Sequence, residues 1–414
     1  MIKSFKFRLY PNKETEKKLF WTLTRCRELY NAALSERKDA YQRFQRITII
    51  VGNEHIVAAT MVAPQKVKSV GFYDQSRDLP EIKYELRPEY QDIAAHVLQN
   101  VLRRLDKAFQ AFFRRIANGE TPGYPRFQGR DRYNSFTYPD QWGWKLEGRS
   151  LHLSKIGDIK IKLHREMQGK IKTCTIKYEA GQWYAVFMCE VEVPEKLLVS
   201  YEDIGIDLGV THLATLSNGE TIEHPRYYRK AEKKIKQLHQ SLDRKKKGSH
   251  RQNKAKKTLS KAYRKTRNQR RDTLHKASKK LVDKYQVIVF EDLQEANLVK
   301  RPKPKQDENG TYLPNGASAK TGLNKSITDA GWYTFTEMVR VKAEWAGRTI
   351  IFVNPYKTSQ VCSGCGTVVK KDLSERWHSC ECGCELDRDH NAAINILTLG
   401  HKQLGGKRPT SATA

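Results

Sequence analysis

Residues 287–293 have the sequence VIVFEDL, and this stretch decides the expected fold. Four consecutive apolar residues, from Val287 to Phe290, predict a central strand that is buried on both faces. Strands of this kind occur in sheets that helices cover on both sides. Glu291 ends the strand just beyond its buried part, which is a common location for chemistry. The stretch therefore predicts a buried central strand with Glu291 at its end as a candidate site residue.

Two other carboxylates also have unusual settings. In DIGIDLGVTHLATLSNGE, residues 203–220, alternating apolar residues predict a hairpin with Asp207 on its first strand. In ELDRDHNAAINIL, residues 385–397, Asp389 lies just ahead of an apolar helix. Taken alone, Asp389 could instead cap that helix and interact with its dipole. Both residues are candidates alongside the glutamate, from separate parts of the chain.

Three carboxylates can hold two Mg²⁺ ions about 4 Å apart, one activating the attacking water and the other stabilising the leaving oxygen of a phosphodiester. Hard oxygen ligands favour Mg²⁺ or Mn²⁺. Bound cations would also offset the repulsion among the neighbouring side chains of Glu385, Asp387 and Asp389. The sequence therefore predicts Asp207, Glu291 and Asp389 as ligands of two Mg²⁺ or Mn²⁺ ions.

The net charge of the chain favours a polyanionic partner. The 414 residues suffice for about two to four domains. They include 76 Lys and Arg against 46 Asp and Glu, for a formal net charge of +30. Nucleic acid is the first candidate partner and an anionic membrane the second. We expect no membrane association and a cytoplasmic location, because the chain has neither an apolar run of spanning length nor a recognisable secretion signal.

A basic segment, residues 226–285, holds 24 Lys and Arg and only 4 Asp and Glu. Apolar residues recur in it at helical spacing, and Gly248 and Ser249 separate its two halves. This pattern predicts a basic helical hairpin with one face docked on the protein. Charge runs usually mark a solvated face, but the single sign and high density here favour a phosphate-binding surface. Such binding should weaken steeply with salt.

Eight cysteines are present, and five of them fall close together in the C-terminal part of the chain: Cys362, Cys365, Cys380, Cys382 and Cys384. In a reducing compartment, this clustering favours metal binding over disulfides. The predicted site is a structural zinc ribbon with Cys362, Cys365, Cys380 and Cys382 as ligands. Which two of Cys380, Cys382 and Cys384 bind is open, and His378 is a further candidate. The remaining cysteines are expected to be buried thiols: Cys26, Cys174 and Cys189.

The N-terminal half predicts a β-domain with helices inserted in it. Residues 2–9 alternate between apolar and basic side chains, as a half-buried strand does. Residues 88–115 have the apolar spacing of a helix. Residues 151–193 alternate again, with a hairpin turn at EAGQ, residues 179–182. The expected result is a small antiparallel, barrel-like domain that the opening strand could join.

Residues 299–325 are poor in apolar residues and rich in Pro, Gly and Lys, so they predict a mobile loop. Ser326 and Asp329 resemble a capping box that starts the next helix. The last residues of the chain predict a frayed tail.

The motifs together resemble a known family. GIDLG with Asp207, FEDL with Glu291, and CSGCG…CECG…DRDHNAAINI with Asp389 look like the split RuvC nuclease of the TnpB family. Members of this family are transposon-encoded relatives of the type V CRISPR effectors. The N-terminal FKFRLYPNKETEKKL…YNAAL and GYPRF are also similar to the start of TnpB proteins. The resemblance therefore spans nearly the whole chain.

The resemblance implies a multidomain α/β protein with an RNase H-like (RuvC) nuclease domain. Its parts would be a β-barrel wedge-like domain at 1–10 and 120–198, an inserted helical recognition domain at 11–119, the nuclease domain at 199–360 and 385–402, an inserted zinc ribbon at 361–384, and a disordered tail at 403–414. The basic hairpin and the loop at 299–325 would belong to the nuclease domain, the loop as a lid.

The activity that the resemblance implies is RNA-guided DNA cleavage. A guide RNA from the transposon end and a double-stranded target DNA would be the partners of a monomeric ribonucleoprotein, which reads a short transposon-adjacent motif itself. By motif position Asp207, Glu291 and Asp389 would be the catalytic triad, with Asp387 ranked second for the third place. Cys384 departs from the family pattern and leaves the zinc ligand set open.

Three alternatives remain. A compact type V CRISPR effector has the same chemistry and differs in its genomic locus. A nuclease-inactive RNA-guided repressor lacks one or more of the triad carboxylates, all of which are present here. A guide-independent resolvase or transposase would cleave DNA after RNase treatment.

Overall fold

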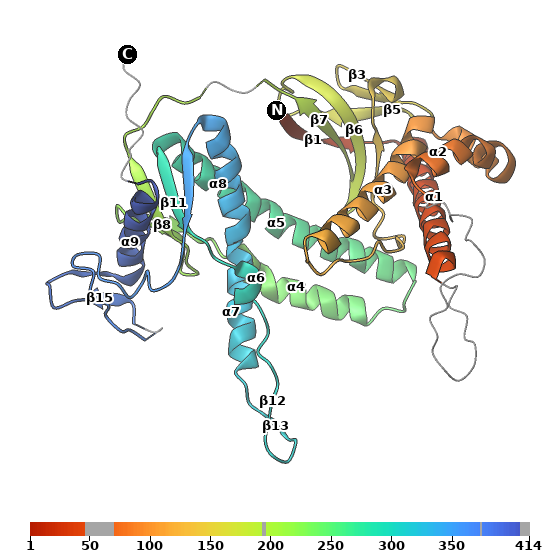
Figure 1. Cartoon of the computed structure of the whole chain (residues 1–414). Helices are drawn as coiled ribbons and strands as arrows, with labels where there is room; N and C mark the ends of the chain where they lie inside the picture. The colour runs from red at the N-terminus through yellow and green to blue at the C-terminus, as the bar shows by residue number, and fades with distance from the viewer. Residues whose placement is uncertain (46–69, 193–195, 373–374, 406–414) are drawn as a thin grey trace, which may run out of the picture. The chain divides into compact units, whose positions relative to one another are not determined.

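The computed structural model describes residues 1–45, 70–192, 196–372 and 375–405. It divides into two compact units, Met1–Glu192 and Val193–Ala414. Each unit contains both helices and strands, so the protein is a multidomain α/β protein (Figure 1).

The first unit is built on a seven-stranded sheet with the order β2-β6-β7-β1-β5-β4-β3. The strands are β1 (Ile2–Tyr10), β2 (Ser135–Tyr138), β3 (Trp144–Glu147), β4 (Ser150–Leu153), β5 (Gly157–Lys162), β6 (Lys170–Glu179) and β7 (Gln182–Glu190). The opening strand β1 lies antiparallel between β7 and β5, with Phe5 opposite Phe187 and Leu9 opposite Ile161. The chain between β1 and β2 is therefore an insertion into this sheet.

The expected barrel is not closed by strand pairing. The edge strands β2 and β3 do not pair with each other in the described part of the chain. Only a short connection that contains the turn Gln141–Gly143 joins them, and the Tyr138 hydroxyl of β2 donates to the Ser154 carbonyl, just past β4, at 3.0 Å. The sheet therefore curls until its edges approach, and it is barrel-like. The predicted hairpin at EAGQ is confirmed, since Ala180 and Gly181 have the positive φ angles of a tight turn between β6 and β7.

The helices inserted in this unit are α1 (Lys13–Gln45), α2 (Phe72–Glu81) and α3 (Ala95–Ala117). The helix predicted from Pro88 begins later, at Ala95. Residues Pro88–Asp92 form a 3-10 turn, and Ile93 has extended backbone that interrupts the helical hydrogen bonding. Helices and sheet share one apolar core, which contains the buried thiols predicted from the sequence: Cys26, Cys174 and Cys189.

The second unit has a five-stranded sheet with the order β10-β9-β8-β11-β14. The strands are β8 (Asp203–Asp207), β9 (His212–Leu216), β10 (Thr221–Glu223), β11 (Val287–Glu291) and β14 (Thr349–Val353). The first three form an antiparallel meander, whereas β11 runs parallel to both of its neighbours. All five residues of β11 are buried, which confirms the central strand predicted from VIVFE.

Helices cover both faces of this sheet (Figure 1). Ile288 and Phe290 pack in a core with α5 (His250–Lys284) and α8 (Trp332–Ala346) on one face. Val287 and Val289 point to the opposite face, where they pack with Ile396 of α9 (Arg388–Gln403). Alternation of side chains along one strand thus separates two apolar layers.

The basic segment forms the predicted helical hairpin of α4 (Tyr227–Asp243) and α5. Gly248 has a positive φ of 81° in the turn. The Ser249 hydroxyl then accepts a hydrogen bond of 3.1 Å from the Gln252 amide and caps α5. Ile235 and Leu259 are among the few buried side chains, so most of the hairpin surface is polar and exposed.

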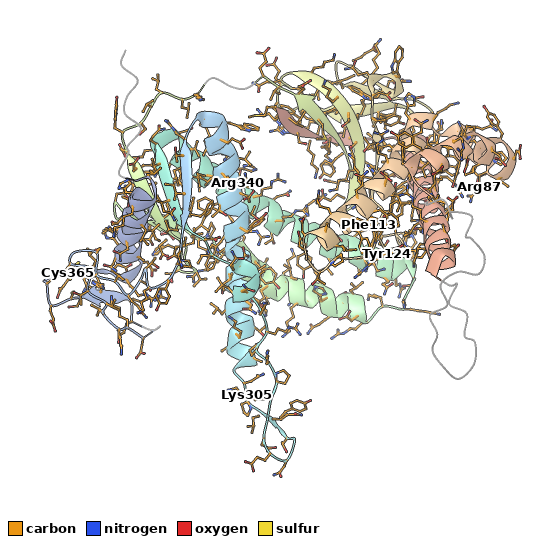
Figure 2. The ribbon with its side chains drawn as sticks, viewed as in Figure 1. Arg87, Phe113, Tyr124, Lys305, Arg340 and Cys365 are labelled. Carbon is orange, nitrogen blue, oxygen red and sulfur yellow. The ribbon has the colours of Figure 1, made fainter. Side chains whose placement is uncertain are left out.

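The structure corrects the loop prediction for residues 299–325. After α6 (Glu295–Leu298), β12 (Lys305–Gln306) pairs with β13 (Tyr312–Leu313), and α7 (Ala317–Ala330) follows. Lys305 lies on this hairpin, which extends beyond the end of α7 (Figure 2). Helix α7 begins where the Asn315 side chain accepts a hydrogen bond from the Ala317 amide.

The predicted capping box at Ser326 and Asp329 is therefore wrong, because both residues lie inside α7. The Ser326 hydroxyl donates to the Gly322 carbonyl, and the buried Asp329 carboxylate accepts from the Tyr228 amide. At the C-terminus α9 ends at Gln403, and residues 406–414 of the predicted tail lie outside the described residues. None of the helices described is both long and apolar enough to cross a bilayer.

Candidate functional site

The sheet of the second unit brings two of the predicted carboxylates to adjacent strand ends. Ile206 is opposite Phe290 in the parallel pair β8–β11, and the next residues along the two strands are Asp207 and Glu291. Neighbouring strands lie about 4.8 Å apart. The carboxyl ends of two parallel strands therefore carry one carboxylate each.

Both side chains face α9. A Cβ placed on Gly205 would lie 2.2 Å from the Ala393 carbonyl oxygen, so this residue of β8 faces α9, and Asp207 has the same parity. In β11, Val289 contacts Gly400 of α9, and Glu291 shares its parity. The two carboxylates are therefore on the α9 side of the sheet.

The direction of α9 brings Asp389 to the same end of the sheet. Near the end of the helix, His401 Nε2 lies 2.9 Å from Asp203 Oδ2, at the start of β8. The helix therefore runs antiparallel to β8, and its first turn reaches the strand's carboxyl end. A Cβ placed on Gly209, just past β8, would lie 3.9 Å from Asp389 Oδ2. The structure thus gathers Asp207, Glu291 and Asp389 in one place.

The electrostatics agree with this convergence. Burial raises the pKa of Asp207 well above its ordinary value, and the negative charges of Glu291 and Asp389 raise it further. Burial also raises the pKa of Glu291, although a hydrogen bond from Thr358 acts in the opposite direction. Three ionised carboxylates in such a place are costly without cations, so the donor set fits hard divalent ions.

The carboxylate oxygens of Asp207, Glu291 and Asp389 do not all lie within 4.8 Å of one another, so they do not form the compact cluster that surrounds a single ion. Among the described residues, the groups of three or more candidate ligand atoms within 4.8 Å of one another contain only cysteines and His378. Two ions about 4 Å apart can be shared by carboxylates that are too far apart to surround one ion.

Asp387, not Asp389, caps α9. Asp387 Oδ1 accepts hydrogen bonds from the amides of Asp389, at 2.9 Å, and His390, at 3.3 Å. The Asp389 carboxylate is contacted instead by the guanidinium groups of Arg388, at 3.6 Å, and Arg376, at 3.7 Å. The capping interpretation that the sequence left open for Asp389 therefore applies to its neighbour.

Thr358 is a site residue that the sequence analysis missed. Its buried hydroxyl donates a short hydrogen bond to Glu291 Oε1. Its carbonyl oxygen accepts a hydrogen bond of 2.9 Å from Asn395 of α9. Thr358 follows β14 by a few residues in NPYKTSQ, residues 354–360, and no local pattern in that stretch shows which carboxylate its hydroxyl contacts.

Two asparagines of α9 fix the loop that carries Thr358. Asn391 and Asn395 donate to the Val361 carbonyl oxygen at 2.8 and 2.7 Å. The Asn391 side-chain oxygen also accepts from the Ser363 amide at 2.9 Å. The helix that carries the third carboxylate therefore also holds the loop that orients the second.

The cysteine cluster lies directly ahead of α9. Four sulfur atoms lie within 4.8 Å of one another, and they belong to the predicted zinc ligands: Cys362, Cys365, Cys380 and Cys382. Cys365 (labelled in Figure 2) has its sulfur atom 3.6 Å from the sulfur of Cys380, which directly follows β15 (Trp377–Ser379). The hairpin of β15 and β16 (Glu385–Asp387) leads into α9, and the Arg388 amide donates to the Arg376 carbonyl at 2.8 Å. The cluster fits a structural zinc ion.

Three family descriptions match parts of the chain. "Probable transposase" of the OrfB/IS605 type matches residues 186–301, which include Asp207 and Glu291. "Cas12f1-like, TNB domain" matches residues 332–396, which include the cysteine cluster and Asp389. "Helix-turn-helix domain" matches residues 1–46, where the structure describes strand β1 and helix α1.

Curated relatives match over most of the chain. One is "Putative RNA-guided DNA endonuclease InsQ" of Escherichia coli K12, 30% identical over 407 residues, which cover 97% of this chain and 93% of the relative. Another is "Putative RNA-guided DNA endonuclease" of Streptomyces pristinaespiralis, 29% identical over 96% of this chain and 89% of the relative.

Solved structures match with low scores. The "Cas12f1-sgRNA-target DNA complex" has 15% identity and a TM-score of 0.32 over 96% of this chain and 99% of that chain. "CasPhi-2 (Cas12j) bound to crRNA" has 11% identity and a TM-score of 0.45 over 97% and 98%. Likeness at this level does not define the fold.

Proposed function

Because the chain belongs to the TnpB family of transposon-encoded RNA-guided DNA endonucleases, we propose that it cleaves DNA under the direction of a guide RNA, by two-metal-ion phosphodiester hydrolysis. The observation that carries this proposal is the convergence of Asp207, Glu291 and Asp389 from three separate segments on one end of a buried sheet.

The sheet supports an RNase H-like (RuvC) nuclease domain. Three antiparallel strands, β10, β9 and β8, are followed by two parallel strands, β11 and β14. The proposed domain comprises residues 199–360 and 385–402, with the zinc ribbon at 361–384 inserted before α9. The carboxyl ends of the parallel strands are where such folds place ligands.

The carboxylates of Asp207, Glu291 and Asp389 fit the role of ligands for two Mg²⁺ or Mn²⁺ ions. Bound there, the ions supply activation of the attacking water and charge stabilisation of the leaving oxygen. The hydroxyl of Thr358 donates a hydrogen bond to the Glu291 carboxylate and so fixes its rotamer. Arg388 at Asp389 holds positive charge beside the site, where a phosphate would enter. All three carboxylates are present, which argues against a nuclease-inactive repressor.

The proposed partners are a guide RNA and a double-stranded target DNA. The hairpin α4–α5 carries most of the excess positive charge, and its exposed lysines and arginines suit phosphate contacts. In guided nucleases, base pairing reads the target and the protein reads a short adjacent motif. We propose a monomeric ribonucleoprotein of this kind.

The test is to sequence the RNA that copurifies with the protein, and then to cleave a plasmid library with that RNA's target beside randomised flanks. We expect Mg²⁺-dependent cleavage that follows the guide sequence and requires one adjacent motif. Asp207→Ala should bind the same target without cutting it. Cleavage that survives RNase treatment would overturn the guided mechanism in favour of a resolvase. Repeat-array sequences in the copurified RNA would indicate a CRISPR effector.

A further inference from the structure

The cysteine cluster contains more metal-binding side chains than one zinc ion needs. Besides the group of four cysteines, a second group brings together ligand atoms of Cys362, His378 and Cys384 within 4.8 Å of one another. Cys362 belongs to both groups. The first group already supplies the four thiolates of a closed tetrahedral site.

His378 has the character of an unused ligand. Its side chain is fully buried, and its Nε2 atom has no hydrogen-bond partner among the described residues. Its other ring nitrogen, Nδ1, contacts Lys371 Nζ. A buried polar atom without a partner costs free energy, which a metal ion bound at Nε2 would offset. The ring proton would then lie on Nδ1, and the Lys371 ammonium, which cannot accept it, would have to move away.

Cys384 lies close to both Cys362 and this imidazole, because the ligand atoms of the three residues are within 4.8 Å of one another. Its Sγ atom is 3.8 Å from the Ser363 hydroxyl. Gly364 lies beside sulfur atoms of both groups, since a Cβ placed on it would be 3.5 Å from Cys382 Sγ and 3.6 Å from Cys384 Sγ. The cysteine that departs from the family pattern therefore has a structural setting of its own.

Charge also favours a second cation. The four thiolates of the closed site outweigh the charge of one divalent ion, and a second divalent ion beside Cys362 would offset this excess. A thiolate sulfur has enough lone pairs to bridge two ions, and Cys362, which is buried and shared by both groups, is in the bridging position.

We propose that the ribbon binds two zinc ions, with Cys362 bridging a closed site of four thiolates and a second site formed by Cys362, His378 and Cys384. Three protein ligands leave the second ion one open position for solvent. The second site would brace the hairpin of β15 and β16, which leads into α9 and Asp389. The proposal does not depend on the nuclease function.

The test is the zinc content of the full-length protein, measured by mass spectrometry of the metal after dialysis against metal-free buffer. We expect two zinc ions per chain in the wild-type protein and one in the double variant His378→Ala with Cys384→Ser. A matched control, Cys189→Ser, removes a buried cysteine far along the sequence from the ribbon and should retain two. One zinc per wild-type chain would overturn the proposal, as would two in the double variant.

A second measurement does not depend on how the variants fold. The wild-type protein, stripped of zinc and titrated with Co²⁺, should take up two equivalents. The first should give the intense thiolate-to-cobalt absorption of four sulfur ligands, and the second a weaker band for mixed sulfur and nitrogen ligands. Saturation at one equivalent with a purely sulfur spectrum would exclude the second site.

Discussion

Asp387 accepts hydrogen bonds from the amides of Asp389 and His390, so two acidic residues separated only by Arg388 have different roles at the start of α9. One fixes the end of the helix, and the other presents its carboxylate to the site. This division predicts different outcomes for the two residues. Asp389→Asn should abolish cleavage with little change in stability, because it removes a proposed metal ligand.

Asp387→Ala should instead destabilise the protein by about 1 kcal/mol, because it removes a helix cap. Asp387→Ser, which can still cap, should retain both stability and most cleavage. Thermal unfolding and single-turnover cleavage of the three variants check these outcomes. Loss of cleavage in Asp387→Ser equal to that in Asp389→Asn would assign the third ligand to Asp387.

Asp207→Asn should make the metal-free protein more stable at neutral pH. The pKa of Asp207 in the folded protein is raised above its ordinary value of 3.8, by burial and then by Glu291 and Asp389. The folded state therefore binds the proton more tightly than the unfolded state, and the stability of the wild-type protein falls as the pH rises from about 4 towards the folded pKa. Asp207→Asn has no ionisable group at this position, so its stability should not fall with rising pH for this reason.

The measurement is thermal unfolding in EDTA at pH 5 and pH 8, for the wild-type protein and Asp207→Asn. Asp292→Asn, an exposed carboxylate directly after β11, is the matched control. Added Mg²⁺ should stabilise the wild-type protein at pH 8 and should have less effect on Asp207→Asn. If the difference in stability between the wild-type protein and Asp207→Asn is the same at both pH values, the pKa of Asp207 is not raised in the folded protein.

Thr358→Val should reduce cleavage by about 10- to 100-fold, the usual cost of losing a side chain that orients a metal ligand. Valine keeps the shape of threonine but cannot donate the hydrogen bond to Glu291. Thr358→Ser keeps the hydroxyl and should cleave nearly as well as the wild-type protein. The distinguishing measurement is the Mg²⁺ concentration for half-maximal cleavage. This concentration should rise for Thr358→Val and should not change for Thr358→Ser.

A purely structural role for Thr358 predicts another pattern. In that case both substitutions would lower the unfolding temperature, and the Mg²⁺ requirement of the remaining activity would be unchanged.

Gly205→Ala should displace α9 and weaken cleavage. The added Cβ would lie 2.2 Å from the Ala393 carbonyl oxygen and 2.6 Å from the Leu397 amide nitrogen, and backbone atoms cannot move aside as a flexible side chain can. Gly322→Ala is the control, because that helical glycine has no atom within 4 Å of the added Cβ. Unfolding temperature and cleavage rate should fall for the first variant and not for the second.

Removing two lysines from the basic hairpin should reduce the salt dependence of guide RNA binding. Lys257 and Lys261 are exposed on α5. Their joint replacement by Gln should lower the slope of log affinity against log salt by about one unit for each RNA phosphate that the hairpin no longer neutralises.

The control replaces Lys276 and Lys279 of the same helix, which already pair with Asp272 and Asp283 at 2.7 Å. This pair of substitutions should change the slope less. Equal slopes for the wild-type protein and both variants would mean that this part of α5 does not contact RNA phosphates.

The sequence predicted those elements whose burial is visible in consecutive residues. Strand β11 is buried on both faces, and its four-residue apolar run could be recognised without knowledge of its neighbours. Helix α7 was missed for the opposite reason. It buries only Ile327, Asp329 and Ala330, all near its end, so it has no apolar stripe from which a helix could be predicted.

Contacts between distant positions could not be predicted from local patterns. The carboxylates were each found from their settings, but Thr358 is separated from Glu291 by three helices and three strands, and its hydroxyl has no sequence signal. Gly205 is similar, because its requirement for glycine comes from the backbone of α9, which approaches it only in the folded protein. Such residues become recognisable only when packing is known.

The position of Asp389 on α9, the last helix of the described residues, also sets an order of events during synthesis. The basic hairpin leaves the ribosome more than a hundred residues before α9 does. If the proposed roles hold, a nascent chain presents its basic hairpin to the guide RNA well before its acidic centre is complete. Under the same proposal, a frameshift late in the reading frame removes Asp389, keeps the basic hairpin, and yields a product that holds RNA and does not cut.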